Sequence, residues 1–332
     1  MDYHTNFALN LLLSSDTDFV EFKFKAEILT SENFGNVRKM FNPVYVSNIC
    51  MDDCIYCGYR ISNRDVKRKE LTVFQSIEEV NFLTQRGVKN ILILAGEYKH
   101  EKYVSMLCKQ IRGIKQNTNI NSLGVEIASL EISDYTKILE AGADSITIFQ
   151  ETYDKHRYAF LHKKGLKADY QYRLEAPERA CAAGFTSVGL GILFGVNDWK
   201  NDIIALVNHA KSLQDKFPNL KLRFSFPRLK ESYGQDITCQ KEIVNDNQII
   251  RSIVLLRLLF PNCDLILSGR ENCNFLLSNA SIVNIFGKSG TTKVGGYTTY
   301  VKENELEQFE LNDDVNFTEF TEKLKTKGYA IA

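Results

Sequence analysis

Short apolar runs rich in β-branched residues alternate with amphipathic stretches along this 332-residue chain. Each run is apolar along almost its whole length, as is typical of parallel strands covered on both faces. Eight strands are expected, at residues 43–49, 90–95, 123–130, 145–150, 187–194, 221–226, 264–268 and 282–286. Helices are expected between and after them, at residues 76–86, 101–115, 133–141, 168–183, 198–216, 241–260, 271–279 and 318–327. The alternation predicts an α/β fold, a (β/α)8 TIM-type barrel.

A doubly wound open sheet is the alternative fold for such an alternation. That fold calls for a glycine-rich phosphate loop after its first strand, and here the loop carries cysteines instead. We therefore expect a barrel over residues 43–296, a helical extension over 1–42, and a segment over 297–332 that packs on the barrel. Functional side chains of such barrels lie on the loops that follow the strands.

The charge balance excludes several classes of partner. Forty-one basic side chains match forty-one acidic ones, so the net charge is +0 and nothing global attracts nucleic acid or an anionic membrane. No run approaches the roughly 18 apolar residues of a membrane span. The N-terminus carries Asp2 and has no basic segment before its short apolar run, unlike a secretory signal. We expect a cytoplasmic protein without nucleic-acid or membrane partners.

Eight cysteines fall into two groups. In a cytoplasmic chain they are expected to be reduced thiols. Five stand apart in apolar or mixed surroundings and are expected to be packed, non-functional thiols: Cys108, Cys181, Cys239, Cys263 and Cys273. The other three, Cys50, Cys54 and Cys57, form a CxxxCxxC triplet directly after the first expected strand. Such close spacing indicates that the three thiols bind one metal centre.

Three thiolates are one fewer than the four that an ordinary [4Fe–4S] cluster or a closed zinc site takes. If the metal is a [4Fe–4S] cluster, one iron remains open for an exogenous ligand. A zinc site completed by a distant thiol such as Cys108 is the alternative, although zinc ligands usually come as paired CxxC units.

The triplet, with Tyr56 before its third cysteine, resembles the signature of radical S-adenosylmethionine (SAM) enzymes. Segments along nearly the whole chain, from about Leu11, are similar to those of the radical SAM aromatic amino acid lyases, and most to the tyrosine lyases of thiamin biosynthesis: PVYVSNICMDDCIYCGY, ILAGE, FQETYDKHRY, RLEAPERACAAGF, VGLGILFGVNDW, SFPRL, GRE and VGGY. The resemblance implies reductive cleavage of SAM to a 5′-deoxyadenosyl radical and fragmentation of L-tyrosine at Cα–Cβ to p-cresol and dehydroglycine. It also implies a reductant such as flavodoxin or ferredoxin, and thiazole synthase as a candidate partner.

The resemblance also implies roles for single residues. Cys50, Cys54 and Cys57 hold the cluster; the SAM contacts are Tyr56 at the adenine, Gly96 and Glu97 at the amino group, Glu126 at the ribose, and Glu151 and Arg173. Arg270 matches the arginine that clamps the substrate carboxylate, and Tyr45 matches a tyrosine that faces the substrate. Without the family, Glu151 and Arg173 read as a solvated ion pair. Tyr45 alone reads equally well as an inward-facing barrel residue.

Two segments near the expected carboxylate pocket depart from the family pattern. Gly269 replaces the usual threonine before Arg270, and residues 286–290 replace the usual Ser-Ala-Gly-Ser. Either Ser289 supplies the missing hydroxyl or the pocket takes another amino acid, such as L-tryptophan in a 3-methyl-2-indolic acid synthase. A third possibility is a non-catalytic iron–sulfur or zinc-binding barrel. The hydrogenase-maturation tyrosine lyases continue into a second cluster domain that this sequence lacks, so production of CO and cyanide is not expected.

Overall fold

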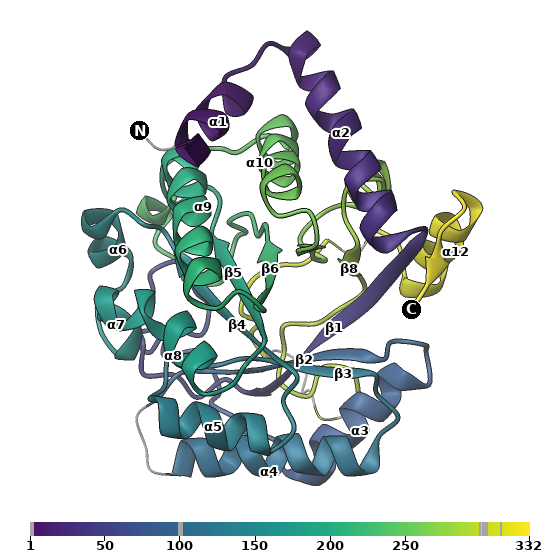
Figure 1. Cartoon of the computed structure of the whole chain (residues 1–332). Coiled ribbons are helices and arrows are strands. Elements are labelled where there is room, and N and C mark those ends of the chain that lie inside the picture. The colour runs from purple at the N-terminus through teal and green to yellow at the C-terminus, as the bar shows by residue number, and fades with distance from the viewer. Residues whose placement is uncertain (1–2, 99–101, 299, 301–304, 313) are drawn as a thin grey trace.

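The computed structural model describes residues 3–98, 102–298, 300, 305–312 and 314–332, and a parallel barrel forms its centre (Figure 1). Strand β1 pairs with both β2 and β8, which closes the barrel. The strands are β1 Val37–Ser47, β2 Asn90–Ala95, β3 Ser122–Glu126, β4 Ser145–Glu151, β5 Ser187–Ile192, β6 Lys221–Ser225, β7 Asp264–Leu267 and β8 Ile285–Gly287. All eight pair in parallel, which confirms the predicted (β/α)8 fold.

Helices follow the strands and cover the barrel, and Figure 1 shows α3, α4 and α5 along one side of it. Capping boxes begin two of the helices: Thr72 pairs with Gln75, and Asn245 pairs with Gln248. The connecting helices are α3 Val73–Thr84, α4 Lys102–Asn117, α5 Ile132–Glu140, α6 Lys155–Leu161, α7 Tyr170–Leu174, α8 Ala176–Ala182, α9 Trp199–Lys216, α10 Asp246–Leu259 and α11 Cys273–Ser278. Residue 101, the expected start of one helix, lies outside the described residues.

The helix expected over residues 168–183 is in fact three short pieces. A 3-10 turn, η1 Leu166–Ala168, precedes α7 and α8. Pro177 lies in the first turn of α8, where its missing N–H costs nothing, and so marks a new helix start. This break matters for function because α7 carries Arg173.

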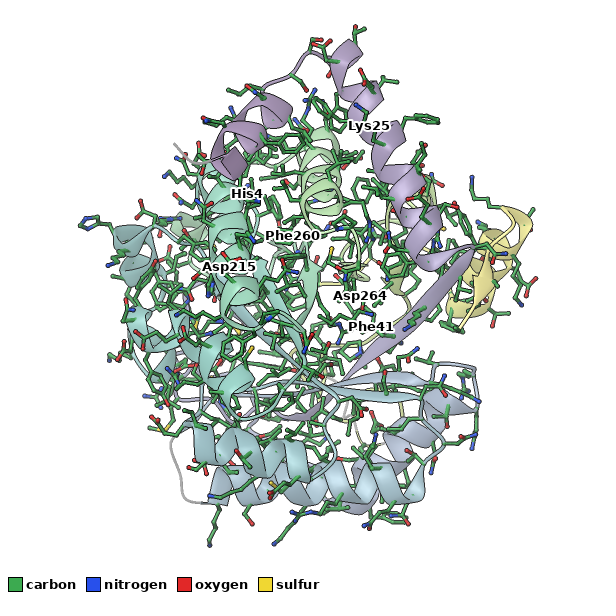
Figure 2. The ribbon with its side chains drawn as sticks, viewed as in Figure 1. His4, Lys25, Phe41, Asp215, Phe260 and Asp264 are labelled. Atoms are coloured by element: carbon green, nitrogen blue, oxygen red, sulfur yellow. The ribbon has the colours of Figure 1, made fainter. Side chains whose placement is uncertain are left out.

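The N-terminal extension consists of α1 Tyr3–Leu12 and α2 Asp16–Phe34, which pack on α9 and α10 (Figure 1). Figure 2 labels Lys25 on α2, where its side chain is exposed and pairs with Glu21, whereas Phe260 and Asp264 lie in the interior. Strand β1 begins at Val37 and pairs with barrel strand β8 from Lys39 onward, so the barrel begins a few residues before residue 43. The sequence did not indicate this start because a charged residue such as Arg38 is unusual in a buried strand. In the structure its buried guanidinium donates to the carbonyls of Ala280 and Gly35.

The C-terminal part divides into two regions. Helix α12 Phe317–Thr326 and strand β9 Ala330–Ile331 pack on the outside, with β9 paired to the start of β1. Residues 305–312, here called the mouth segment, instead lie over the barrel mouth. They are hydrogen-bonded there to the loops after β1, β6 and β7 through Gln308, Glu310 and Asn312. Residues 299, 301–304 and 313 of the expected segment lie outside the described part.

No helix among the described residues is both long enough and apolar enough to span a bilayer.

Candidate active site

The barrel lumen forms a deep cavity that opens at the carboxyl ends of the strands. It measures about 1870 Å³ including its open mouth. Eleven of the twelve predicted site residues line it: Tyr45, Cys50, Cys54, Tyr56, Cys57, Gly96, Glu97, Glu126, Glu151, Arg173 and Arg270. Sequence positions from 45 to 270 therefore converge on one site, as expected of a barrel whose loops gather at one face.

The loop after β1 carries the three cysteines and is held by its neighbours. The Met51 N–H donates to the carbonyl of Glu97, and the Ile55 N–H donates to the carbonyl of Leu161. Within the loop, the Cys57 N–H donates to the carbonyl of Cys54 at 3.0 Å. These backbone bonds tie the loop to the β2 and α6 regions and present all three thiols to the lumen.

The donor set fits a cluster with one open iron. All eight cysteines are free thiols, and the three of the loop are the cysteines among the described lining residues. Cys108 lies elsewhere and donates to the carbonyl of Lys137, so it does not complete a zinc shell with the loop. Within the described residues, no three His, Cys, Asp or Glu side chains lie close enough together to hold a single metal ion. Burial raises the pKa of Cys50, Cys54 and Cys57, and a bound metal would oppose that rise because it binds the thiolate form.

A buried ion pair joins Arg173 and Glu97 beside the cysteine loop. Nη1 of Arg173 lies 3.0 Å from Oε1 of Glu97, and Nε donates to the carbonyl of Phe149 at 3.0 Å. Arg173 is only 2% exposed. Oε2 of Glu97 is buried and has no hydrogen-bond partner, which is costly unless a ligand supplies a donor. This free acceptor agrees with a role at the amino group of SAM.

Glu151 forms a second buried ion pair, with Lys167. Nζ of Lys167 lies 2.5 Å from Oε1 of Glu151. Burial opposes ionisation of Glu151, but the Lys167 ammonium outweighs it and holds the pKa of that carboxyl below its usual value. Glu151 has a left-handed φ of 67°, a strained conformation that recurs at functional sites. Glu151 and Arg173 therefore pair with different buried partners, and the interpretation of a solvated pair is wrong.

Lys167 was missed in the sequence because nothing local marks it as a ligand. The nearby Gly165 is the signal that could have found it. Its φ is 93°, and an added Cβ would lie 2.0 Å from Oδ1 of Asp52 in the cysteine loop. Only glycine allows this close approach, which brings Lys167 to the cavity wall.

Tyr56 has a partner that the sequence also did not reveal. Its hydroxyl lies 2.9 Å from Nε2 of His162, and Nδ1 of His162 lies 2.8 Å from the carbonyl of Tyr158. Burial lowers the pKa of His162 to about 3, so the imidazole is neutral. Nδ1–H then donates to the carbonyl and Nε2 accepts from Tyr56, which fixes the ring of Tyr56 at the cavity wall.

Arg270 and Tyr45 line the same cavity. Nη1 of Arg270 donates to the carbonyl of Arg228 at 2.8 Å, and its guanidinium lies 3.4 Å from the ring centroid of Phe309. The Tyr45 hydroxyl donates to Oε1 of Gln308 at 2.6 Å. Phe309 and Gln308 belong to the mouth segment, so this segment orients both of the predicted substrate contacts.

Ser289 is the one predicted site residue that does not line the cavity. It has a left-handed φ of 55°, and its hydroxyl donates to the carbonyl of Val315 at 3.4 Å. The preceding Lys288 pairs with Asp314 at 2.5 Å, which anchors this stretch toward the C-terminal segment. The structure thus does not bring the Ser289 hydroxyl to the cavity wall beside Arg270, and a role for it in the carboxylate pocket stays a prediction.

Glu126, at the end of β3, makes stability depend on pH. Burial and the charge of Glu151 raise its pKa from 4.5 to about 7. The folded state then binds more protons than the unfolded state between these values, so stability falls as pH rises through this window. We expect Glu126→Gln to stabilise the ligand-free protein by about 2 kcal/mol more at pH 8 than at pH 5. Urea unfolding at both pH values measures this, with the exposed Glu32→Gln as control. An equal effect of Glu126→Gln at both pH values would contradict the expectation.

Two family profiles match the chain. The profile of the radical SAM superfamily matches residues 44–207, which include the cysteine loop. The profile of the Biotin and Thiamin Synthesis associated domain matches residues 225–330, which include Arg270 and the mouth segment.

Similar proteins cover most of the chain. It is 32% identical over 292 residues to 2-iminoacetate synthase from Escherichia coli K12, which covers 87% of this chain and 76% of that protein. The Salmonella typhimurium 2-iminoacetate synthase is 32% identical over 306 residues, 91% of this chain and 79% of that protein. A crystal structure of HydG, a maturase of the [FeFe]-hydrogenase, has a TM-score of 0.91 and 33% identity, covering 98% of this chain and 72% of that one. The chain therefore belongs to the radical SAM superfamily and is an enzyme of the family that contains 2-iminoacetate synthase.

Proposed function

We propose that this enzyme reductively cleaves SAM and uses the resulting 5′-deoxyadenosyl radical to fragment L-tyrosine at Cα–Cβ into p-cresol and dehydroglycine. The carrying observation is that two sets of side chains, here called the two halves of the cavity, line one and the same cavity. One half holds the cysteine loop with the Glu97–Arg173 and Glu151–Lys167 pairs, and the other holds Arg270 and Tyr45. The 32% identity to two 2-iminoacetate synthases supports tyrosine as substrate.

In this proposal Cys50, Cys54 and Cys57 hold the [4Fe–4S] cluster, which together with SAM supplies the radical. Glu97 accepts from the amino group of SAM through its unpaired Oε2. Arg173 holds Glu97 in place and offers its remaining N–H donors to the SAM carboxylate. Because Arg173 and Glu97 are already ordered by packing, little reorganisation is needed on binding.

The remaining SAM contacts lie around the same half of the cavity. Tyr56 lies beside the adenine, its hydroxyl held by His162. Glu126 and Glu151 reach the ribose and the charged end of SAM, and Lys167 keeps Glu151 ionised. Gly96 lets the loop after β2 lie against the cysteine loop, because an added Cβ would lie 2.3 Å from the carbonyl oxygen of Ile49.

The substrate half fixes the amino acid. Arg270 binds the α-carboxylate of tyrosine with guanidinium N–H groups other than the one donated to Arg228. Holding that end orients the rest of the molecule toward the radical, and orientation matters most because the radical abstracts any nearby hydrogen. Loss of one hydrogen atom from tyrosine and Cα–Cβ scission give dehydroglycine and a hydroxybenzyl radical. One electron and one proton convert that radical to p-cresol.

The reaction consumes one electron for SAM cleavage and one for the hydroxybenzyl radical. We propose that a cytoplasmic reductant of the flavodoxin or ferredoxin class supplies both. Dehydroglycine is an unstable imine, so a recipient such as thiazole synthase, which uses it to build the thiazole of thiamin, is the expected consumer.

Anaerobic turnover with each aromatic amino acid tests the proposal. The reconstituted enzyme is incubated with SAM, a reductant and either tyrosine or tryptophan, and the products are separated. We expect 5′-deoxyadenosine, p-cresol and glyoxylate, the hydrolysis product of dehydroglycine, with tyrosine alone. Formation of 3-methyl-2-indolic acid from tryptophan would replace the tyrosine assignment. Absence of 5′-deoxyadenosine with every amino acid would overturn the radical reaction.

A further inference from the structure

One side chain, that of Gln308 in the mouth segment, contacts both halves of the cavity. Its Oε1 accepts a hydrogen bond from the Tyr45 hydroxyl at 2.6 Å. Its Nε2 lies 3.5 Å from Sγ of Cys57, within the range of an N–H···S hydrogen bond. A single amide group therefore links the substrate-facing tyrosine to a cluster ligand.

The backbone of Gln308 is held on both sides. Its N–H donates to Oγ1 of Thr292 at 3.2 Å, and its carbonyl accepts from the N–H of Gly58 at 3.0 Å. A Cβ at Gly58 would lie 2.6 Å from the carbonyl oxygen of Glu307 and 2.7 Å from that of Gln308. Glycine directly after Cys57 thus allows the mouth segment to lie against the cysteine loop. These contacts place the backbone of Gln308 beside the cysteine loop.

The chemistry of the two partners sets which way the amide points. A tyrosine hydroxyl can donate or accept, whereas a metal-bound thiolate has no proton and can only accept. With Cys57 bound to iron, Nε2 of Gln308 must face the sulfur and Oε1 must face Tyr45. The Tyr45 O–H then donates its hydrogen bond to Oε1, so toward the lumen the hydroxyl oxygen can only accept.

We propose that Gln308 is a positioning residue that donates a hydrogen bond to the Cys57 sulfur and thereby makes the Tyr45 hydroxyl an acceptor for a donor group of the substrate. The hydrogen bond to Cys57 matters only if the proposed cluster is bound there, and the hydrogen bond from Tyr45 matters only if the proposed amino acid substrate binds beside it. The proposal therefore rests on the proposed function.

Donation to the sulfur has a measurable effect on the cluster itself. A reduced cluster carries one more negative charge than the oxidised one, so an N–H donor stabilises it more and raises the reduction potential. Removing that donor should make the potential more negative. This readout needs neither SAM nor tyrosine, so it is separate from the success of the lyase reaction.

Two variants of similar shape test the proposal on the reconstituted full chain. Gln308→Met removes both the donor and the acceptor, and Gln308→Glu replaces the donor with an oxygen. With iron content equal to wild type, we expect more negative midpoint potentials for both, and tyrosine binding weakened about tenfold in Gln308→Met. Gln240→Met, on an exposed loop outside the cavity lining, is the matched control and should keep the wild-type potential. Tyr45→Phe should shift the potential less than Gln308→Met, because the sulfur keeps its donor.

Pulsed EPR gives a second test that does not depend on a variant. The reduced wild-type cluster in protein labelled with side-chain ¹⁵N-glutamine should show hyperfine coupling to an amide nitrogen. Absence of that coupling, or an unchanged potential in an iron-replete Gln308→Met protein, would overturn the proposal. Loss of p-cresol formation with the coupling intact would contradict the proposed lyase reaction but not the role of Gln308 at Cys57.

Discussion

Cys54→Ala is expected to abolish 5′-deoxyadenosine formation and the visible absorbance of the iron–sulfur cluster. Cys54 is 6% exposed and lies between the other two ligands in a loop fixed by neighbouring backbone bonds, so no other thiol can take its place. Two thiolates leave the cluster without a stable ligand set. We expect the rate to fall at least about a thousandfold, which corresponds to about 4 kcal/mol in the barrier. Iron content and product analysis after reconstitution measure both losses.

Cys263→Ala is the matched control for this prediction. Cys263 is also a buried free thiol, but it lies directly before β7, at the amino end of that strand, and does not line the cavity. We expect it to keep full iron content and turnover while losing about 1 kcal/mol of stability through lost packing. Turnover by an iron-depleted Cys54→Ala protein, or equal loss of iron in both variants, would contradict the role assigned to Cys54.

The strand pattern could be predicted from sequence because a barrel strand is buried on both faces. Runs such as Asn90–Ala95 are therefore apolar throughout and stand out between polar helices. The prediction failed where a strand breaks this rule. The first six residues of β1 include Arg38, whose charge is satisfied by buried carbonyls that only the folded chain brings near. When only the neighbouring sequence is considered, such a charged residue is predicted to lie on the surface.

Site residues carried by long local motifs were also predictable, and eleven of them line one cavity. The residues that support them were not. Lys167, His162 and Gln308 act through partners distant in sequence, and Gln308 lies 251 positions from Cys57. The position of Ser289 was equally unforeseen, because its hydroxyl donates to the carbonyl of Val315 and its φ is left-handed, and nothing in the local sequence indicates either feature. Motifs identify ligands, whereas tertiary contacts decide how those ligands are held.

Arg270→Ala is expected to uncouple SAM cleavage from tyrosine fragmentation. The guanidinium is oriented by the Arg228 carbonyl and by Phe309 before any substrate binds, so its removal loses a preformed carboxylate site. Leaving a buried carboxylate unpaired typically costs 2–5 kcal/mol, so we expect tyrosine binding to weaken about a hundredfold. SAM binding should stay within about twofold of wild type because its proposed contacts are held by the Glu97–Arg173 and Glu151–Lys167 ion pairs, which do not include Arg270. Equilibrium binding of each ligand and the ratio of p-cresol to 5′-deoxyadenosine measure the effect.

Two further variants separate recognition from folding. Arg270→Lys keeps the charge but loses the fork that matches a carboxylate, so it should restore part of the tyrosine affinity. Arg251→Ala removes another buried arginine, which donates to the Leu11 carbonyl and pairs with Asp16 far from the cavity. It should lower stability without changing tyrosine binding. If Arg251→Ala and Arg270→Ala weakened tyrosine binding equally, the loss would reflect general destabilisation and Arg270 would not be the carboxylate clamp. If only Arg270→Ala does so and Arg270→Lys recovers part of it, the side chain acts through its charge and its shape together.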